Sequence, residues 1–132
     1  MKPEIGQTAT IEKTLDQRTV EAFASVSEDY NPIHLDEDFA KNTQFERPIV
    51  HGMLASSLIS GLLASKVPGA GSIYLGQSMK FVRPIFVGET VTAKVEVTSV
   101  REDKPIAIIS TQVLNADGQV AIDGEATVMC AV

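Results

Sequence analysis

The sequence predicts an α+β domain in which an antiparallel β-sheet wraps around one buried α-helix. The first observation is the stretch Gly52–Ser65, which has no charged side chain and carries its large apolar residues at helical spacing. The second is the period-two alternation that dominates the chain after Gly71. Because this helix has no charged face, we expect the rest of the chain to cover it on all sides. It is shorter than the about 20 apolar residues that a bilayer requires.

The region before this helix predicts one strand, short helices and a long loop. Gln7–Leu15 alternates weakly and indicates the first strand. Thr14 or Asp16 can cap an amphipathic helix that contains Phe23, and Asp36 can cap one or two further helical turns. The polar remainder, which is punctuated by two prolines, is expected to be loop. Long ordered loops in compact domains tend to carry function.

The region after the helix predicts four strands, each with one apolar face. They are Tyr74–Arg83, Thr90–Arg101, Ile106–Leu114 and Val120–Ala131, and the last two form a hairpin around Asn115–Gly118. Such strands form an antiparallel sheet with one side against the core. A sheet of this kind curled around an apolar helix is the hot-dog fold, with the short helices before it as lids. Its long edge strands predict a homodimer or a higher homo-oligomer that covers them.

Composition restricts the class of protein further. A length of 132 residues predicts a single domain that spans residues 1–132. The net charge of −6, without any cluster of Lys or Arg, argues against nucleic acid as the main partner. The single Cys130 excludes an internal disulfide and a cysteine-rich metal site, and its apolar neighbours predict a buried thiol. The N-terminus has no apolar signal region and no segment predicts a membrane span, so we expect a cytoplasmic protein.

A proline-containing turn before the helix carries the strongest chemical pattern. The run DYNPIH begins at Asp29 and ends at His34. Pro32 has a fixed φ and favours extended geometry at Asn31, so a rigid turn can direct Asp29 and His34 toward one point. Such a pair can hold a water molecule, take its proton and return a proton to a product. The alternative is that the aspartate is only a turn former and the histidine a packed residue.

The helix entrance supplies a second element of the pattern. Free N–H groups of a first helical turn stabilise developing negative charge, so the Gly52 amide is a candidate oxyanion donor. We expect His51 to fix the turn or cap the helix, and the helix serines to pack and bond back to helix carbonyls. The sequence contains no nucleophile elbow, phosphate-binding glycine loop or metal-ligand spacing.

Two motifs together resemble a known family. The run DYNPIHLD from Asp29, followed by FERPIVHGM from Phe45, resembles the R-specific enoyl-CoA hydratases of the MaoC-like dehydratase family, which are hot-dog proteins. The run MKFVRPIFVGETV from Met79 is similar to the family's strand after the central helix, so the resemblance covers nearly the whole chain. One departure is Glu28, where the family usually has glycine before the aspartate.

This resemblance implies reversible syn addition of water to a trans-2-enoyl thioester, which gives the (R)-3-hydroxyacyl thioester. It implies that Asp29 and His34 hold and activate the water, and that Asp29 exchanges the proton with the α-carbon. It also implies that Gly52 polarises the thioester carbonyl, that Asn31 supports the turn, and that Ser60 gives the pair a supporting hydrogen bond. The resemblance implies no metal or redox cofactor. Coenzyme A or acyl carrier protein enters as part of the substrate.

Some questions stay open at this level. Lys66, Lys80 and Arg83 can compensate the charge of a polyanionic substrate handle, or they can be ordinary solvated charges. Two other functions fit the same fold: a hot-dog acyl-CoA thioesterase, which directs water at the carbonyl, and a non-catalytic subunit that binds acyl chains. The Asp-x-Asn-Pro-x-His turn favours hydration over both.

Overall fold

The structure is a computed structural model that describes residues 2–131. Five strands and four helices follow one another along this part of the chain. In order they are β1 (Thr8–Thr14), α1 (Gln17–Ser27), α2 (Pro32–Leu35), α3 (Glu37–Lys41), α4 (Gly52–Ser65), β2 (Ile73–Phe81), β3 (Thr90–Val100), β4 (Ile106–Leu114) and β5 (Val120–Met129).

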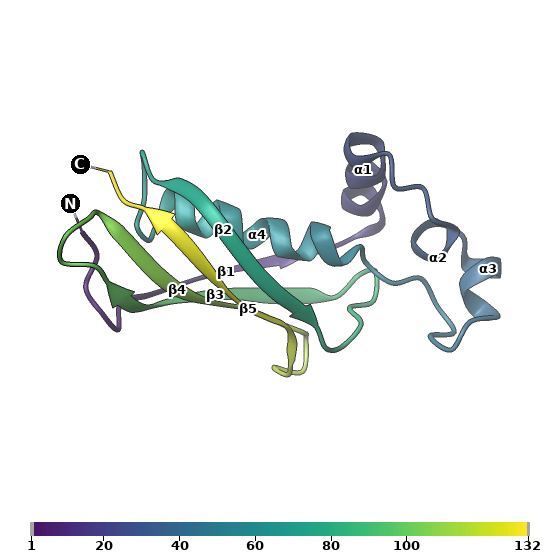
Figure 1. Cartoon of the computed structure of the whole chain (residues 1–132). Helices are drawn as coiled ribbons and strands as arrows, with labels where there is room; N and C mark the ends of the chain where they lie inside the picture. The colour runs from purple at the N-terminus through teal and green to yellow at the C-terminus, as the bar shows by residue number, and fades with distance from the viewer. Residues whose placement is uncertain (1, 132) are drawn as a thin grey trace.

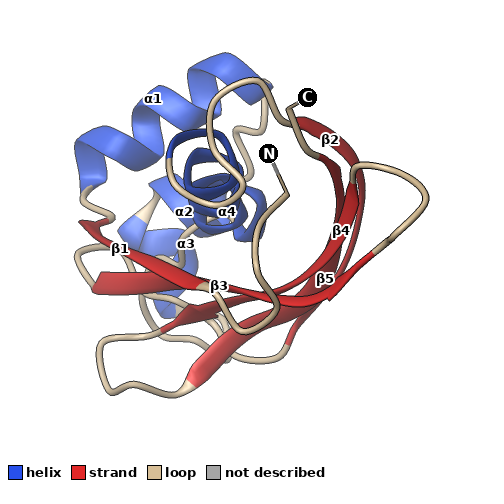
Figure 2. Ribbon diagram, turned by 90° about the vertical axis from the view of Figure 1, so that its left-hand side faces the viewer, coloured by secondary structure: helices blue, strands red, loops and turns tan. Residues whose placement is uncertain are grey.

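The five strands form one antiparallel sheet in the order β1-β3-β4-β5-β2. β3 and β4 alternate buried residues with more exposed ones, as the sequence pattern predicts. The sheet curves around α4, which lies along its concave face (Figures 1 and 2). The prediction of a hot-dog arrangement is therefore confirmed.

The core lies between α4 and the concave face of the sheet. The helix contributes Leu54, Ala55, Ile59, Leu62 and Leu63, all of which are buried. The strands contribute mainly valine and alanine, and β-branched residues of this kind pack well on a pleated surface. Cys130 is buried as predicted. Among residues 2–131, no helix combines the length and the apolar character needed to cross a bilayer.

One face of α4 is not covered by its own chain, so the prediction of full enclosure is wrong for a single copy. Met53 is 59% exposed, and Ser57, Ser60 and Gly61 are exposed beside it. A Cβ atom built on Gly61 would have no atom within 4 Å. The sheet of one chain reaches only the side of the helix that carries leucine and isoleucine. The small residues leave an uncharged surface on the other side.

The three short helices pack at the end of the sheet where α4 begins (Figure 1). Asp16 caps α1 and Asp36 caps α3, as predicted. The stretch Pro32–Leu35, which was predicted to be loop, forms α2 instead. Asn31 caps this helix by accepting the Ile33 N–H. Pro32 occupies the first turn, where the missing N–H of proline costs no hydrogen bond, because first-turn N–H groups have no acceptor within the helix. A helix of four residues is too short to show helical periodicity in the sequence.

We expect Leu62→Ala to lower the free energy of unfolding by about 2–5 kcal/mol, because Leu62 is fully buried between helix and sheet. Ser65→Ala is the matched control on the same helix. Its side chain is exposed and bonds only to the Gly61 carbonyl, so the change stays within about 0.5 kcal/mol. Urea unfolding of both variants measures the difference, and equal stabilities would contradict the packing described here.

Candidate active site

A cavity of about 420 Å³ opens at the N-terminal end of α4. Its polar lining includes Asp29, His34, His51 and Arg83. Its other walls are mainly apolar, and they come from the segment before α4, the start of α4, the end of β2 with the loop that follows it, and β5: Phe45, Ile49, Val50, Met53, Phe81, Val82, Pro84, Ile85 and Ile122. A mostly apolar cavity with a few convergent polar groups is typical of a small-molecule site.

Asp29 lies on the turn between α1 and α2, where its carboxylate is held by local hydrogen bonds. Its Oδ1 accepts the Asn31 N–H at 3.1 Å, and its own N–H donates to Ser27 Oγ at 3.2 Å. This is the Asx geometry that aspartate adopts readily. The preceding Glu28 ends α1 in the left-handed region with φ of 63°. Glycine reaches this conformation without strain, which explains why the family usually has glycine there.

His34 lies on α2, and its ring is oriented by the backbone of the segment that enters α4. Its Nδ1–H donates to the Ile49 carbonyl at 2.7 Å, which leaves Nε2 as an acceptor. Burial lowers the pKa of His34 below 6.5. The Ile49 carbonyl raises it, the nearby His51 lowers it further, and Asp29 raises it. The net effect is downward, so the imidazole is neutral at pH 7 and its Nε2 lone pair is available.

His51 occupies the N-cap position of α4 but makes no capping hydrogen bond with its side chain. Its Nε2–H donates to the Asp29 carbonyl at 3.0 Å. Its ring stacks on His34 with a centroid separation of 3.8 Å and an interplanar angle of 27°. The sequence predicts a turn-fixing or capping role for His51, and the structure shows that it connects the two turns across 22 residues of sequence.

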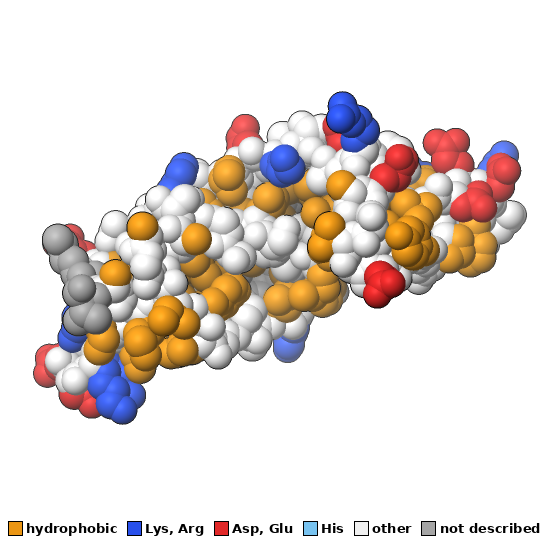
Figure 3. Space-filling view, turned by 90° about the horizontal axis from the view of Figure 1, so that it is seen from above, with side chains coloured by type: hydrophobic (Ala, Val, Ile, Leu, Met, Phe, Trp, Pro, Cys, Tyr) orange, Lys and Arg blue, Asp and Glu red, His pale blue; other side chains and the backbone are white. Residues whose placement is uncertain are grey.

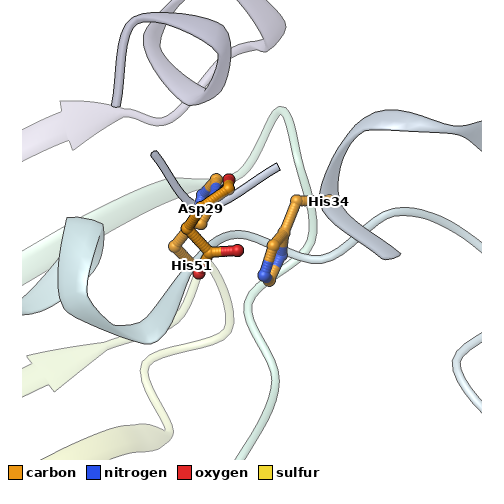
Figure 4. A group of neighbouring side chains, drawn as sticks. All are labelled: Asp29, His34 and His51. Atoms are coloured by element: carbon orange, nitrogen blue, oxygen red, sulfur yellow. The ribbon is translucent and has the colours of Figure 1, made fainter. Parts of the chain in front are cut away.

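Asp29, His34 and His51 offer ligand atoms that all lie within 4.8 Å of one another (Figure 4). Two histidines and a carboxylate can in principle hold a divalent metal ion. However, imidazole lone pairs lie in the ring plane, and two rings stacked almost parallel do not direct their lone pairs at one ion. The arrangement suits a water molecule shared by Asp29 and His34 better.

Gly52 is the first residue of α4 and lines the same cavity. The N–H groups of a first helical turn have no acceptor within the helix, and the helix dipole adds positive character there. A Cβ atom built on Gly52 would lie 2.5 Å from Cε1 of Phe81, so a side chain here would displace the wall of the cavity. Glycine therefore lets the backbone amide approach a bound molecule closely.

Ser60 lines a different pocket from the Asp29–His34 pair, and its supporting hydrogen bond to them stays a prediction. It lines a second, more open pocket of about 560 Å³ between α4 and β2, together with Ser57 and Tyr74. Spacing alone could not separate the two pockets, because both lie along the same helix. The other serines of the helix bond back to its carbonyls as expected: Ser56 donates to Gly52 O and Ser57 to Leu54 O.

Of the three basic residues predicted as partners of a charged handle, only Arg83 lines the site. Lys66 donates to the Thr10 carbonyl, and Lys80 lines a different pocket beside Asp123 and Glu125. Sequence reasoning missed Arg47, whose guanidinium lies 3.8 Å from the centroid of the Phe86 ring.

Arg47 and Arg83 both line a smaller pocket of about 230 Å³ beside the site. The two arginines are far apart in the sequence, and no local pattern connects them.

Comparison with known proteins gives a consistent result. Residues 2–117 match the family model described as MaoC like domain. The chain is 58% identical over 125 residues to the (R)-specific enoyl-CoA hydratase of Aeromonas caviae, covering 95% of this chain and 93% of that protein. It is 44% identical to the (R)-specific enoyl-CoA hydratase of Rhodospirillum rubrum, covering 94% of this chain and 85% of that one.

The fold agrees with this relationship. The solved structure of the (R)-hydratase from A. caviae superposes with a TM-score of 0.96 at 56% identity, over 98% of both chains. With two sequence motifs meeting at one cavity, and with a family match over most of its length, the chain belongs to the MaoC-like domain family of hot-dog proteins.

Proposed function

We propose that the protein is an (R)-specific enoyl-CoA hydratase that adds water reversibly to trans-2-enoyl-CoA and forms (R)-3-hydroxyacyl-CoA. The observation that carries the proposal is the convergence of Asp29 and His34 on one cavity beside the N-terminus of α4. The relatives that share most of their length with this chain carry the same activity in their names. The reaction is a carbon–oxygen lyase reaction.

In the proposed mechanism, one water molecule lies between the Asp29 carboxylate and Nε2 of His34. The water oxygen forms a bond to C3 of the enoyl group, and the electrons of the double bond move toward the thioester carbonyl. One water proton passes to the pair, and Asp29 delivers a proton to C2. The elements of water are added, and no other reactant is consumed. Because one pair handles both the oxygen and the proton, both add to the same face.

The Gly52 amide stabilises the negative charge that develops on the thioester oxygen. Backbone donors of this kind are typically worth several kcal/mol when they are directed at the charge of the transition state. The apolar walls around the amide strengthen this interaction by excluding water. No metal or redox cofactor is required, since the chemistry needs only proton transfer and charge stabilisation.

The thioesterase alternative uses the same cavity but requires water at the carbonyl carbon. In this structure the pair that would hold the water comes from the turn before α2 (Asp29) and from α2 itself (His34), and the amide that would hold the carbonyl oxygen belongs to α4. Such a separation suits attack at C3, which lies beyond the carbonyl along the acyl chain. The non-catalytic alternative gives no reason for a neutral imidazole beside a carboxylate in an apolar cavity.

The phosphate-bearing handle of coenzyme A, or the phosphopantetheine of a carrier protein, leaves the site past Arg83. Arg83 lines both the reaction cavity and the smaller pocket that contains Arg47. Nearby Glu89 is occupied, because its carboxylate accepts the backbone N–H groups of Phe86 and Ala116. The smaller pocket is also lined by the carboxylates of Glu89 and Asp117, so Arg47 and Arg83 offer cationic groups to a phosphate within a mixed charge environment.

The proposed assembly is a homodimer in which a second copy covers α4 and β2. Within the described residues, β2 is an edge strand whose one partner is β5, and its Ile73, Leu75 and Phe81 are 56%, 48% and 55% exposed. Apolar side chains gather on this face of the molecule (Figure 3). The small residues of α4 would let another backbone approach closely. A symmetric dimer would bury both features.

Loss of either member of the pair tests the activity. We expect Asp29→Asn and His34→Ala each to lower kcat by at least about a hundredfold, because each change removes an acid–base group. Both proteins should fold, since Asp29 is exposed and His34 makes one side-chain hydrogen bond. The assay follows loss of the enoyl absorbance of crotonyl-CoA. Thiol release without hydration would support the thioesterase, and unchanged turnover in either variant would remove the mechanism.

The role of Arg83 in handle binding can be measured separately. We expect Arg83→Gln to raise KM for crotonyl-CoA roughly fivefold, equivalent to about 1 kcal/mol for a partly solvated charge pair. The kcat and the KM for crotonyl-pantetheine, which has no phosphate, should stay near wild type. Arg83→Lys is the charge-conserving control. An equal increase in KM for both substrates would show that Arg83 acts on the cavity wall instead.

The dimer predicts a specific response to a surface charge. We expect Leu75→Lys, on the exposed edge strand, to shift the protein to a monomer in sedimentation velocity, because the charge would be buried against the second copy. Ile5→Lys is the matched control: Ile5 is 69% exposed, outside β2 and α4, and the variant should sediment like wild type. A monomeric wild-type protein would contradict the proposed assembly.

A further inference from the structure

His51 is a buried, ionisable side chain at the site that the proposed mechanism does not use. It is 2% exposed, and it contacts three segments that are separate in the sequence. Its ring lies between Phe23 of α1, at a centroid separation of 4.9 Å, and His34 of α2. Its Nε2–H reaches the main chain of Asp29. It is also the residue directly before Gly52.

The hydrogen bond to Asp29 holds a residue that is otherwise loosely fixed. The Asp29 side chain is exposed, and its remaining hydrogen bonds connect it to Ser27 and Asn31 within the same turn. The bond from His51 is the contact that joins this turn to α4 and hence to the Gly52 amide. It therefore sets the distance between the proton-transferring carboxylate and the oxyanion donor.

The stacking of the His51 ring on the His34 ring restricts the position of His34 in a similar way. The bond from His34 Nδ1 to Ile49 fixes one edge of that ring, and the face of His51 limits its rotation about that edge. Both constraints fix the orientation of the His34 ring, which lines the cavity. An error of about 1 Å in the position of a reacting group can cost a hundredfold in rate, so such constraints matter for turnover.

The second nitrogen of His51 shows that stability alone does not account for this residue. Within residues 2–131, His51 Nδ1 is buried and has no hydrogen-bond partner. A buried polar atom without a partner is destabilising, and such atoms in native structures need an explanation. A phenylalanine would fill the space between Phe23 and His34 without this defect. A leucine would do so too, but only the imidazole also provides the donor to Asp29.

We propose that His51 is a positioning residue that aligns Asp29 and His34 with each other and with the Gly52 amide, through its Nε2–H and the face of its ring. The inference rests on the proposed hydratase function. His51 does not take part in proton transfer. Its nitrogen that faces Asp29 is bonded to the main-chain carbonyl, and its other nitrogen has no partner.

The stack also affects the protonation of His34. The charged or titratable side chains that line the cavity are Asp29 from the turn, His51 from the start of α4 and Arg83 from the loop after β2. A phenylalanine ring stacked on His34 would favour the protonated form of His34 through a cation–π interaction. The His51 ring present in this position instead lowers the pKa of His34. Replacing His51 by phenylalanine should therefore raise the pKa of His34. The acid limb of kcat/KM, where His34 becomes protonated and inactive, would move to higher pH.

Three substitutions separate the two contacts of His51. His51→Gln places an amide N–H near the position of Nε2 and keeps the donor to Asp29, whereas His51→Asn is similar in chemistry but too short to reach it. His51→Phe keeps the stack and loses the donor. We expect His51→Gln and His51→Phe, which each lose one of the two contacts, to fall in kcat by about threefold to tenfold, and His51→Asn, which loses both, to fall further, in each case with little change in KM.

Two further measurements exclude a purely structural role. Ile109→Ala, in β4 and outside the cavity lining, should lower the melting temperature without changing the pH profile. His51→Phe should leave the melting temperature near or above that of wild type, while its acid limb moves to higher pH. Equal losses in the Gln and Asn variants, or losses that follow the melting temperature, would overturn the proposal.

The test does not depend on the hydratase activity alone. An NMR titration of the His34 ring reports its pKa in wild type and in His51→Phe, even if crotonyl-CoA is not turned over. An unchanged pKa would overturn the part played by the stack. Inactivity of the wild-type enzyme toward enoyl-CoA, with the shift present, would instead contradict the proposed function.

Discussion

The burial of one face of an uncharged helix is the constraint on which the rest of the structure depends. The leucine and isoleucine side of α4 can leave water only inside a curved sheet, and this fixes the helix axis relative to all five strands. The N-terminus of the helix then lies at a defined end of the sheet, the end at which α1 to α3 are placed (Figure 1). The Gly52 amide is consequently held by the whole core and not by a loop. A hydrogen-bond donor directed at developing charge stabilises a transition state most when it does not have to reorganise.

The sequence was sufficient for features that depend on local or periodic patterns. The strands, α4 and the turn that carries Asp29 ahead of Pro32 follow from alternation, helical spacing and the fixed φ of Pro32. The sequence was insufficient where contacts between residues far apart in the chain determine the structure. The four residues of α2 form a helix because Asn31 caps them and Ile33 accepts a hydrogen bond from Ile49. The separate pocket of Ser60, the uncovered face of α4 and the pairing of Arg47 with Phe86 likewise have no local signature.

The two histidines acquire complementary tautomers from backbone carbonyls. Ile49 accepts from Nδ1 of His34, and Asp29 accepts from Nε2 of His51, so a different nitrogen carries the proton in each ring. Carbonyl oxygens cannot donate, and each of these hydrogen bonds therefore specifies its tautomer without a charged partner. Nε2 of His34 is left without a proton near a carboxylate, which is the state that the proposed proton acceptor for water needs. Burial then keeps the ring neutral by lowering its pKa.

Three unusual local features lie together at this site. Glu28 adopts a left-handed conformation immediately before Asp29, which costs about 1–3 kcal/mol for a residue other than glycine. His51 leaves a buried nitrogen unpaired, and Gly52 accepts no side chain because Phe81 lies against it. The first two features lower stability, and all three adjoin or form part of the Asp29, His34 and Gly52 group. The leucine and isoleucine contacts of α4 with the sheet offset this cost, since burial of one such side chain contributes about 1.5–3 kcal/mol. A core that exceeds the minimum needed for folding is thus what allows the helix entrance to be shaped for chemistry.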